Sequence, residues 1–124
     1  MLPITGDTPE QRHDCPIRNV LANLNGKWQP LILLSLEGGP QRFNAIKRLI
    51  GDISQRVLTE NLRTLERDGY LSRTVQPTSP VRVDYELTAM GQSLLGVLRP
   101  MVLWAAEVYP KVRAVRDAYD SRLG

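Results

Sequence analysis

The segment 54–68 carries the side chains best suited to recognition chemistry. Gln55 and Arg56 stand at its start, and their amide and guanidinium groups can form paired hydrogen bonds with adenine and guanine, respectively. Arg63 lies farther along and is better suited to hold a phosphate. A solvated surface helix could carry the same polar face, so the interpretation depends on the neighbouring elements. The candidate DNA-binding residues of the whole chain are Arg42, Ser54, Gln55, Arg56, Thr59, Arg63, Arg67 and Arg82. For Arg82 the alternative is a surface salt bridge with Asp84 or Glu86, which would contribute little.

Local signals predict that this segment is a helix. Ser54 can accept a hydrogen bond from an otherwise unpaired amide in the first turn. Ile53 and Leu58 are spaced to form a hydrophobic staple, and Gly69 supplies the left-handed residue that ends a helix. The apolar residues recur at spacings of four and three and fall on one face: Leu58, Leu62 and Leu65.

The elements on either side predict a helix-turn-helix followed by a wing. A short amphipathic segment, 43–50, is joined to the 54–68 helix by a glycine-containing turn of typical length. After Gly69 the pattern becomes alternating over 71–75 and 81–87, and the connection between these stretches contains two prolines. This pattern predicts a hairpin with one buried face. The expected fold class is mainly α with a small β-hairpin: a winged helix-turn-helix, with its wing at about 71–87 and terminal dimerisation helices.

The last predicted helix, about 88–122, is more apolar than a single small domain requires. Thr88 can cap it, and Pro100 and Pro110 each remove one backbone hydrogen bond, which predicts a bend rather than an end. Its apolar residues recur at threes and fours over more than twenty residues, so we expect the excess surface to form a homodimer interface. The expected interface residues are Leu98, Met101, Val102, Trp104, Ala105, Val108, Tyr109 and Val112.

Length and charge limit the possible organisation. The 124 residues suffice for one domain, 15–124, preceded by a polar arm, 1–14, that we expect to be flexible. Between Arg42 and Arg82 there are eight basic and four acidic residues, a net charge of +4. The remainder has eight basic and nine acidic residues, a net charge of −1. The positive charge therefore coincides with the predicted helix-turn-helix and wing, where a phosphate backbone would lie, although a solvated basic face is the alternative.

The residue inventory argues against an enzyme. His13 is the only histidine and Cys15 the only cysteine, so we expect no catalytic residues, no cofactor and no metal site. The single cysteine fits a reducing cytoplasm, no secretory signal is visible, and the most apolar run, 31–34, is too short to span a membrane. These features predict a cytoplasmic protein without a membrane partner. The main alternative function is a winged domain that binds another protein instead of DNA.

Several short motifs in combination carry a family resemblance that extends from about Cys15 to Trp104. They are Cys15-Pro16, Gly26-Lys27-Trp28, Leu31-Ile32-Leu33, Gly39-Pro40-Gln41-Arg42-Phe43, Ile53-Ser54-Gln55-Arg56-Val57-Leu58-Thr59, Leu62-Arg63-Thr64-Leu65-Glu66-Arg67-Asp68-Gly69 and Val83-Asp84-Tyr85-Glu86-Leu87-Thr88. Together they resemble the HxlR family of small bacterial winged-helix transcriptional regulators, which are related in architecture to the MarR regulators. The resemblance implies a dimer on double-stranded DNA, with paired recognition helices in successive major grooves. It leaves open whether a small-molecule effector or another signal controls binding.

Cys15 is a possible sensor. It precedes Pro16 at the predicted start of a helix, where first-turn amides would stabilise a thiolate. The family resemblance implies that a cysteine at this place serves some members as a sensor of oxidants or electrophiles. Because the chain has no second cysteine, oxidation could only join two protomers or attach a small thiol. A small, inert cap under the terminal helices is the alternative.

Overall fold

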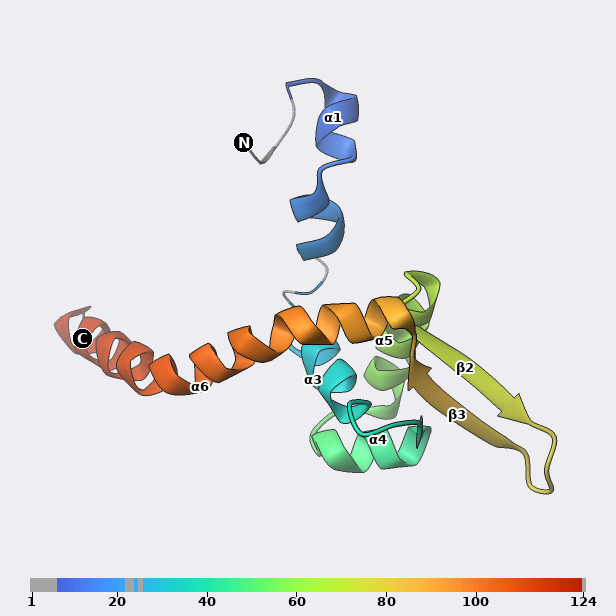
Figure 1. The fold of residues 1–124 in the computed structure, drawn as a ribbon. Coiled ribbons are helices and arrows are strands. Elements are labelled where there is room, and N and C mark those ends of the chain that lie inside the picture. The colour runs from blue at the N-terminus through green and yellow to red at the C-terminus, as the bar shows by residue number, and fades with distance from the viewer. Residues whose placement is uncertain (1–6, 22–23, 25, 124) are drawn as a thin grey trace.

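The computed structural model describes residues 7–21, 24 and 26–123, which form a mainly helical fold with a small antiparallel sheet (Figure 1). The elements in chain order are α1 (Pro9–His13), the π-helical turn η1 (Ile17–Leu21), α3 (Trp28–Ser35), β1 (Gln41–Arg42), α4 (Phe43–Ile50), α5 (Gln55–Arg67), β2 (Leu71–Gln76), β3 (Arg82–Leu87) and α6 (Ala89–Leu123). Within these residues, no helix combines the length and the apolar character needed to cross a membrane.

Helices α4 and α5 form the predicted helix-turn-helix. The turn between them begins at Gly51, whose positive φ of 95° few other residues adopt. Ser54 caps α5, because its Oγ accepts a hydrogen bond from the Val57 amide at 3.1 Å. Gly69, with a φ of 84°, follows the end of this helix. Helix α5 therefore begins after Ser54 and ends before Gly69, as the capping signals predict.

The sheet has three strands in the order β1–β3–β2, all antiparallel. Strands β2 and β3 form the predicted hairpin, and their register runs from the pair Leu71–Leu87 to the pair Gln76–Arg82. The two-residue strand β1 pairs with the other side of β3, opposite Tyr85 and Asp84. The wing is thus anchored by a strand that directly precedes the helix-turn-helix.

The hydrophobic core lies where α3, α4, α5, the base of the hairpin and the first turns of α6 meet. Ile53 and Leu58, the two members of the expected staple, are both buried in it. The buried core residues are Leu24, Ile32, Leu33, Leu36, Ile46, Ile53, Leu58, Leu62, Leu65, Leu71, Leu87, Leu95 and Leu98. Because all three predicted apolar positions of α5 are included, the opposite face of this helix remains available to solvent.

The wing departs from the expected one-face-buried alternation. Val75 and Val81 are exposed, although their phase in the pattern predicts burial, and the polar residue Asp84 is buried instead. Figure 1 gives the physical reason: the outer part of the hairpin extends beyond the helices, so no core lies beneath it. Asp84 lies nearer the base on the central strand, with β1 on one side and β2 on the other.

Helix α6 is continuous through Pro100 and Pro110, as predicted, and its path bends in Figure 1. One expected interface residue requires correction. Leu98 is only 2% exposed and packs with Leu95 into the hydrophobic core of the chain, so it is not available to a partner. The reason is that the first part of α6 packs against α3 and β3, and only the later part extends away from the other elements (Figure 1).

The N-terminal arm, 1–14, contains regular structure that its polar composition did not indicate. Thr8 accepts a hydrogen bond from the Gln11 amide at 3.1 Å, and the Gln11 side chain accepts one from the Thr8 amide at 3.1 Å. This reciprocal capping starts the short helix α1. Residues 1–6 of the expected flexible arm lie outside the described residues.

Candidate nucleic-acid interface

The first turn of α5 presents two polar side chains to solvent. Gln55 and Arg56 are both exposed, directly after the Ser54 cap. Arg56 Nε donates a hydrogen bond to Glu60 Oε1 at 3.1 Å, one helical turn later. Both partners are largely exposed, so this ion pair is weak and a stronger acceptor, such as a guanine edge, can replace it.

Two hydroxyl groups of this helix differ in what they can offer a ligand. Ser54 Oγ accepts from the Val57 amide, which leaves its own hydrogen available for donation. Thr59 Oγ1 donates its only hydrogen to the Gln55 carbonyl oxygen at 2.8 Å. In this conformation Thr59 therefore offers a methyl group and acceptor lone pairs rather than a donor.

Arg63 lies at a cavity of about 320 Å³ between α5 and the hairpin. Arg73, on β2, also lines this cavity, so two arginines from different elements border the same space. Arg73 is not among the residues predicted to bind DNA, because it has the same phase in the alternating pattern as the residues expected to be buried. The complete lining consists of Thr59, Leu62, Arg63, Glu66, Arg73 and Tyr85.

Arg67 lies apart from the base-reading end of α5. It occupies the last turn of the helix and is exposed. The rise of an α-helix places it roughly 16 Å along the axis from Arg56. Arg67 and Arg56 could therefore not contact the same base pair, and a phosphate is the more suitable partner for Arg67.

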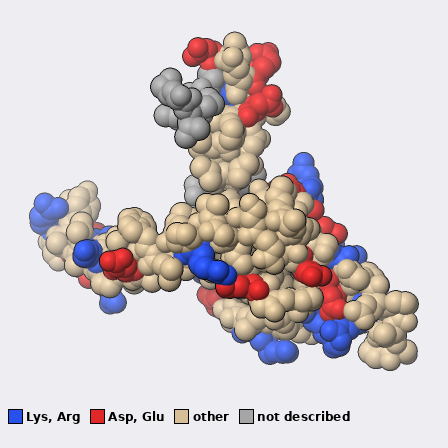
Figure 2. Space-filling model, in the orientation of Figure 1, with Lys and Arg blue, Asp and Glu red and all other residues tan. Residues whose placement is uncertain are grey.

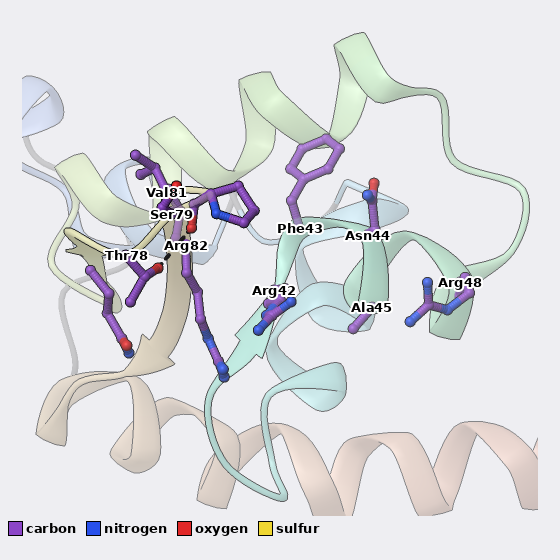
Figure 3. Close-up of a pocket in the computed structure, with 12 residues that line it drawn as sticks. Arg42, Phe43, Asn44, Ala45, Arg48, Thr78, Ser79, Val81 and Arg82 are labelled. Carbon is purple, nitrogen blue, oxygen red and sulfur yellow. Dashed lines mark hydrogen bonds between the residues drawn. The ribbon is translucent and has the colours of Figure 1, made fainter.

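A larger cavity, of about 720 Å³, lies between the wing and the start of α4 (Figure 3). Arg42 and Arg82, both predicted from the sequence, line it together with Arg48, which was counted as a basic residue but not assigned a role. Arg48 also borders a neighbouring hollow with Lys47 at the end of α4. Arg48 lies on the polar side of an amphipathic helix, beside the turn of the helix-turn-helix. That position was the sequence signal that could have identified it as a candidate DNA-binding residue.

Basic side chains mark this side of the molecule. In Figure 2, Lys and Arg residues gather along the lower edge, over α4 and between α4 and the wing. The arginines and lysine that border the three cavities are Arg42, Lys47, Arg48, Arg63, Arg73 and Arg82. These residues lie on β1, on the helix-turn-helix and on the hairpin. The positive charge predicted for this part of the chain is therefore exposed around the three cavities.

Cys15 lies between α1 and η1 and is buried. Its carbonyl oxygen accepts hydrogen bonds from the Asn19 amide at 3.0 Å and from Asn19 Nδ2 at 2.8 Å. The cysteine is not part of the main hydrophobic core. A reagent would therefore reach the sulfur only after a local rearrangement of these N-terminal turns.

The later part of α6 exposes a series of large apolar side chains. Trp104 is 62% exposed, and Met101 and Tyr109 are more than half exposed. Ala105 is also exposed, whereas Val102 and Val108 are partly buried. Further exposed apolar residues of this helix are Val97, Leu103, Val112, Val115, Tyr119 and Leu123. Such a surface on a small domain is typical of a protein–protein interface.

The capped helix α5, the turn before it and the hairpin after it define a winged helix-turn-helix. A family described as HxlR-like helix-turn-helix matches residues 23–113 of the chain. The protein therefore belongs to the HxlR family, and it is a helix-turn-helix transcriptional regulator.

Relatives of known sequence and structure support this assignment. The chain is 38% identical over 103 residues to the HTH-type transcriptional regulator YtfH of Escherichia coli (strain K12), covering 83% of this chain and 82% of the relative. It is similar in fold to the solved transcriptional regulator ytfH from Salmonella typhimurium, with a TM-score of 0.75 and 34% identity over 85% of this chain and 94% of the other. The oxidized form of the redox regulator HypR gives a TM-score of 0.70 and 35% identity over 75% of this chain and 96% of the other.

Proposed function

We propose that the protein binds double-stranded DNA in a sequence-specific manner and thereby regulates transcription. The observation that carries this proposal is the exposed first turn of α5, where Gln55 and Arg56 follow the Ser54 cap. In helix-turn-helix proteins, the N-terminal residues of this helix contact base edges in the major groove. The two arginine-lined cavities, one between the wing and α4 and the other between α5 and the hairpin, suit the phosphates that flank such a groove.

The proposed binding unit is a homodimer on a near-palindromic operator. The apolar surface of α6, centred on Met101, Trp104 and Tyr109, supports a symmetric contact with a second copy. A two-fold dimer would present its two α5 helices to half-sites about 34 Å apart, one turn of DNA. Footprinting tests this spacing, because a single asymmetric half-site would contradict it.

A gel-shift titration against the DNA upstream of the protein's own gene tests the central proposal. We expect tight binding that is selective over unrelated DNA of the same length and weakens as salt is raised. Arg56→Ala serves as the specificity control, because it should reduce the preference for the cognate sequence. Absence of binding at low salt would contradict the proposal and favour a winged domain that binds another protein.

The proposal also includes a response of DNA binding to oxidants. Its support is the similarity to the redox regulator HypR and the presence of Cys15 near the N-terminal turns. The burial of this thiol requires that the N-terminal turns open before it reacts. Comparing DNA binding with and without peroxide or a quinone, in the parent and in Cys15→Ser, separates a sensing cysteine from a packed one.

A further inference from the structure

Asp84 is the only buried carboxylate among the described residues, with 8% of the residue exposed. Arg82 Nε donates to its two carboxylate oxygens at 3.0 and 3.2 Å. Gln76 Nε2, from the paired strand, donates to Oδ2 at 2.7 Å. A buried carboxylate is costly unless it is paired and hydrogen-bonded, and these two partners meet that requirement.

The strand register places this carboxylate between two arginines. Arg42 lies directly opposite Asp84 on β1, and Arg82 precedes it by two residues on β3. Opposed residues of an antiparallel pair share a face of the sheet, as do residues two apart along one strand. Arg42, Asp84 and Arg82 therefore lie on one face, and both arginines line the cavity beside α4.

The bond to Nε determines how Arg82 can act. It fixes the inner edge of the guanidinium group, while the two Nη atoms form the outer end of the side chain. The Arg82 side chain remains 43% exposed despite the pair. In Figure 3, Arg82 and Arg42 extend to the same side of the strands. An arginine held in this way loses less conformational freedom when it binds a ligand.

We propose that Asp84 is a positioning residue for DNA binding: with Gln76, it holds Arg82 so that the guanidinium group faces a phosphodiester of the DNA backbone in the cavity between the wing and α4. The proposal rests on the proposed DNA-binding function. Arg42 and Arg48 supply the other positive charges that border this cavity. Asp84 acts only through Arg82 and does not touch the DNA.

The sign of one substitution distinguishes positioning from simple electrostatics. Asp84→Asn removes a negative charge close to the proposed DNA surface, so electrostatics alone predicts tighter binding. Positioning predicts the opposite, because the neutral amide holds Arg82 less firmly. We expect Asp84→Asn to weaken operator binding by roughly fivefold or more. The plot of log affinity against log salt should also become less steep, with the magnitude of its slope reduced by about one. Unchanged or tighter binding would overturn the proposal.

Glu86→Gln is the matched control. Glu86 lies two residues farther along β3, on the same face, and is exposed, so it loses the same charge without the buried pair. We expect its operator binding to equal or exceed that of the parent. If Glu86→Gln weakened binding as much as Asp84→Asn, the loss would not arise from the Arg82 pair, and the proposal would fail.

A double substitution tests the link between the two residues. In an Arg82→Ala background, Asp84→Asn should cause no further loss of operator affinity, because the side chain that it positions is absent. A loss of the same size in both backgrounds would indicate a general effect on the fold and would overturn the proposal. Thermal unfolding of each variant accompanies the binding measurements.

Arg82→Lys provides a test that leaves Asp84 intact and keeps the positive charge. A lysine ammonium group that binds Asp84 has no further N–H groups that face outward, as the two Nη groups of Arg82 do. This variant should therefore bind the operator nearly as weakly as Arg82→Ala. Binding like that of the parent would overturn the proposal. The parent protein and Arg56→Ala are measured in parallel. A parent that fails to bind any DNA refutes the proposed function itself, whereas normal binding by the parent and by Asp84→Asn refutes only the positioning role.

Discussion

Thr88 Oγ1 donates a hydrogen bond to the Gly69 carbonyl oxygen at 2.6 Å and so joins the start of α6 to the end of α5. Thr88 Oγ1 also accepts a hydrogen bond from the Gly91 amide at 3.1 Å. The Thr88 amide in turn donates to the Tyr70 carbonyl oxygen at 3.1 Å. One residue therefore connects the end of α5, the base of the wing and the long C-terminal helix.

Thr88→Val should reduce the free energy of unfolding by about 1–3 kcal/mol, because the isosteric change leaves two backbone groups without their partner. Urea unfolding at one fixed protein concentration measures the effect, since dimerisation would make stability depend on concentration. Thr74→Val, at an exposed position of β2, is the control and should change stability by less than about 0.5 kcal/mol. Equal stabilities of the two variants would show that the Thr88 hydroxyl does not stabilise this junction.

Gly91→Ala should destabilise the protein more than Thr88→Val. A Cβ atom at position 91 would lie 1.9 Å from the Tyr70 carbonyl oxygen, a backbone atom that cannot rotate away. Gly96→Ala in the same helix is the control, because nothing lies within 4 Å of its added Cβ. Alanine is the better helix former, so this control should be neutral or more stable by up to about 1 kcal/mol. The thermal midpoints of the two variants should therefore differ clearly, and equal midpoints would contradict the close approach.

Arg56→Ala and Arg63→Ala should separate base reading from phosphate contact. We expect Arg56→Ala to cost about 1–3 kcal/mol on the cognate operator and to reduce sequence preference. Arg63→Ala should weaken all sequences alike and lower the salt dependence, because a phosphate contact carries no sequence information. Competition titrations with operator and scrambled DNA measure both properties. If neither substitution changed binding to the native operator, the assignment of these two residues would be wrong.

Trp104→Asp should abolish dimerisation without unfolding the protomer. The side chain is 62% exposed in the single chain, so its removal opens no cavity in the core. A charge in the centre of an apolar interface, however, would have to lose its hydration. Sedimentation at micromolar concentration should show a dimer for the parent and a monomer for the variant. Leu49→Asp, at an exposed apolar position of α4, is the control and should remain dimeric.

Cys15→Ser should make DNA binding insensitive to oxidants if the thiol is the sensor. The parent should then lose operator binding in peroxide with an added small thiol, or in a quinone. Peroxide would oxidise the thiol to a sulfenic acid, which condenses with the Cys15 thiol of a second protomer or with the added thiol and releases water, because the chain offers no second cysteine. A quinone would instead add to the sulfur as a thioether. Non-reducing electrophoresis and mass measurement identify the product. A parent that binds the operator equally well with and without oxidant would leave Cys15 with a packing role.

The helix-turn-helix could be predicted because its signals are local. Ser54, Gly69 and the leucine spacing of α5 act within a few residues of the chain, and all three appear in the structure as expected. The wing strands followed from alternation for the same reason. What local patterns could not supply was where the core ends along each element. Val75 and Leu98 show this in opposite directions: the first lies beyond the core and the second within it.

The predicted site was incomplete for a related reason. Gln55 and Arg56 could be selected from their place in the helix, but Arg48 and Arg73 become candidates only when the fold brings their elements to a shared cavity. Asp84 illustrates the limit most clearly. Its alternation predicted a solvated side chain, and only the pairing of β3 with both neighbours reveals a buried carboxylate beside two arginines.

The single residue between β3 and α6 has a consequence for the proposed dimer. Thr88 alone connects β3 to α6, and its hydroxyl group is hydrogen-bonded both to Gly69, before the wing, and to Gly91, in α6. The direction of the wing is therefore coupled to the direction of α6. Two protomers that meet along α6 would thus set the separation of both wings as well as that of both recognition helices. In such a dimer, a change in the crossing angle of the two α6 helices would move both α5 helices and both wings together. The spacing of the operator half-sites would then be determined by the geometry of the α6 pair.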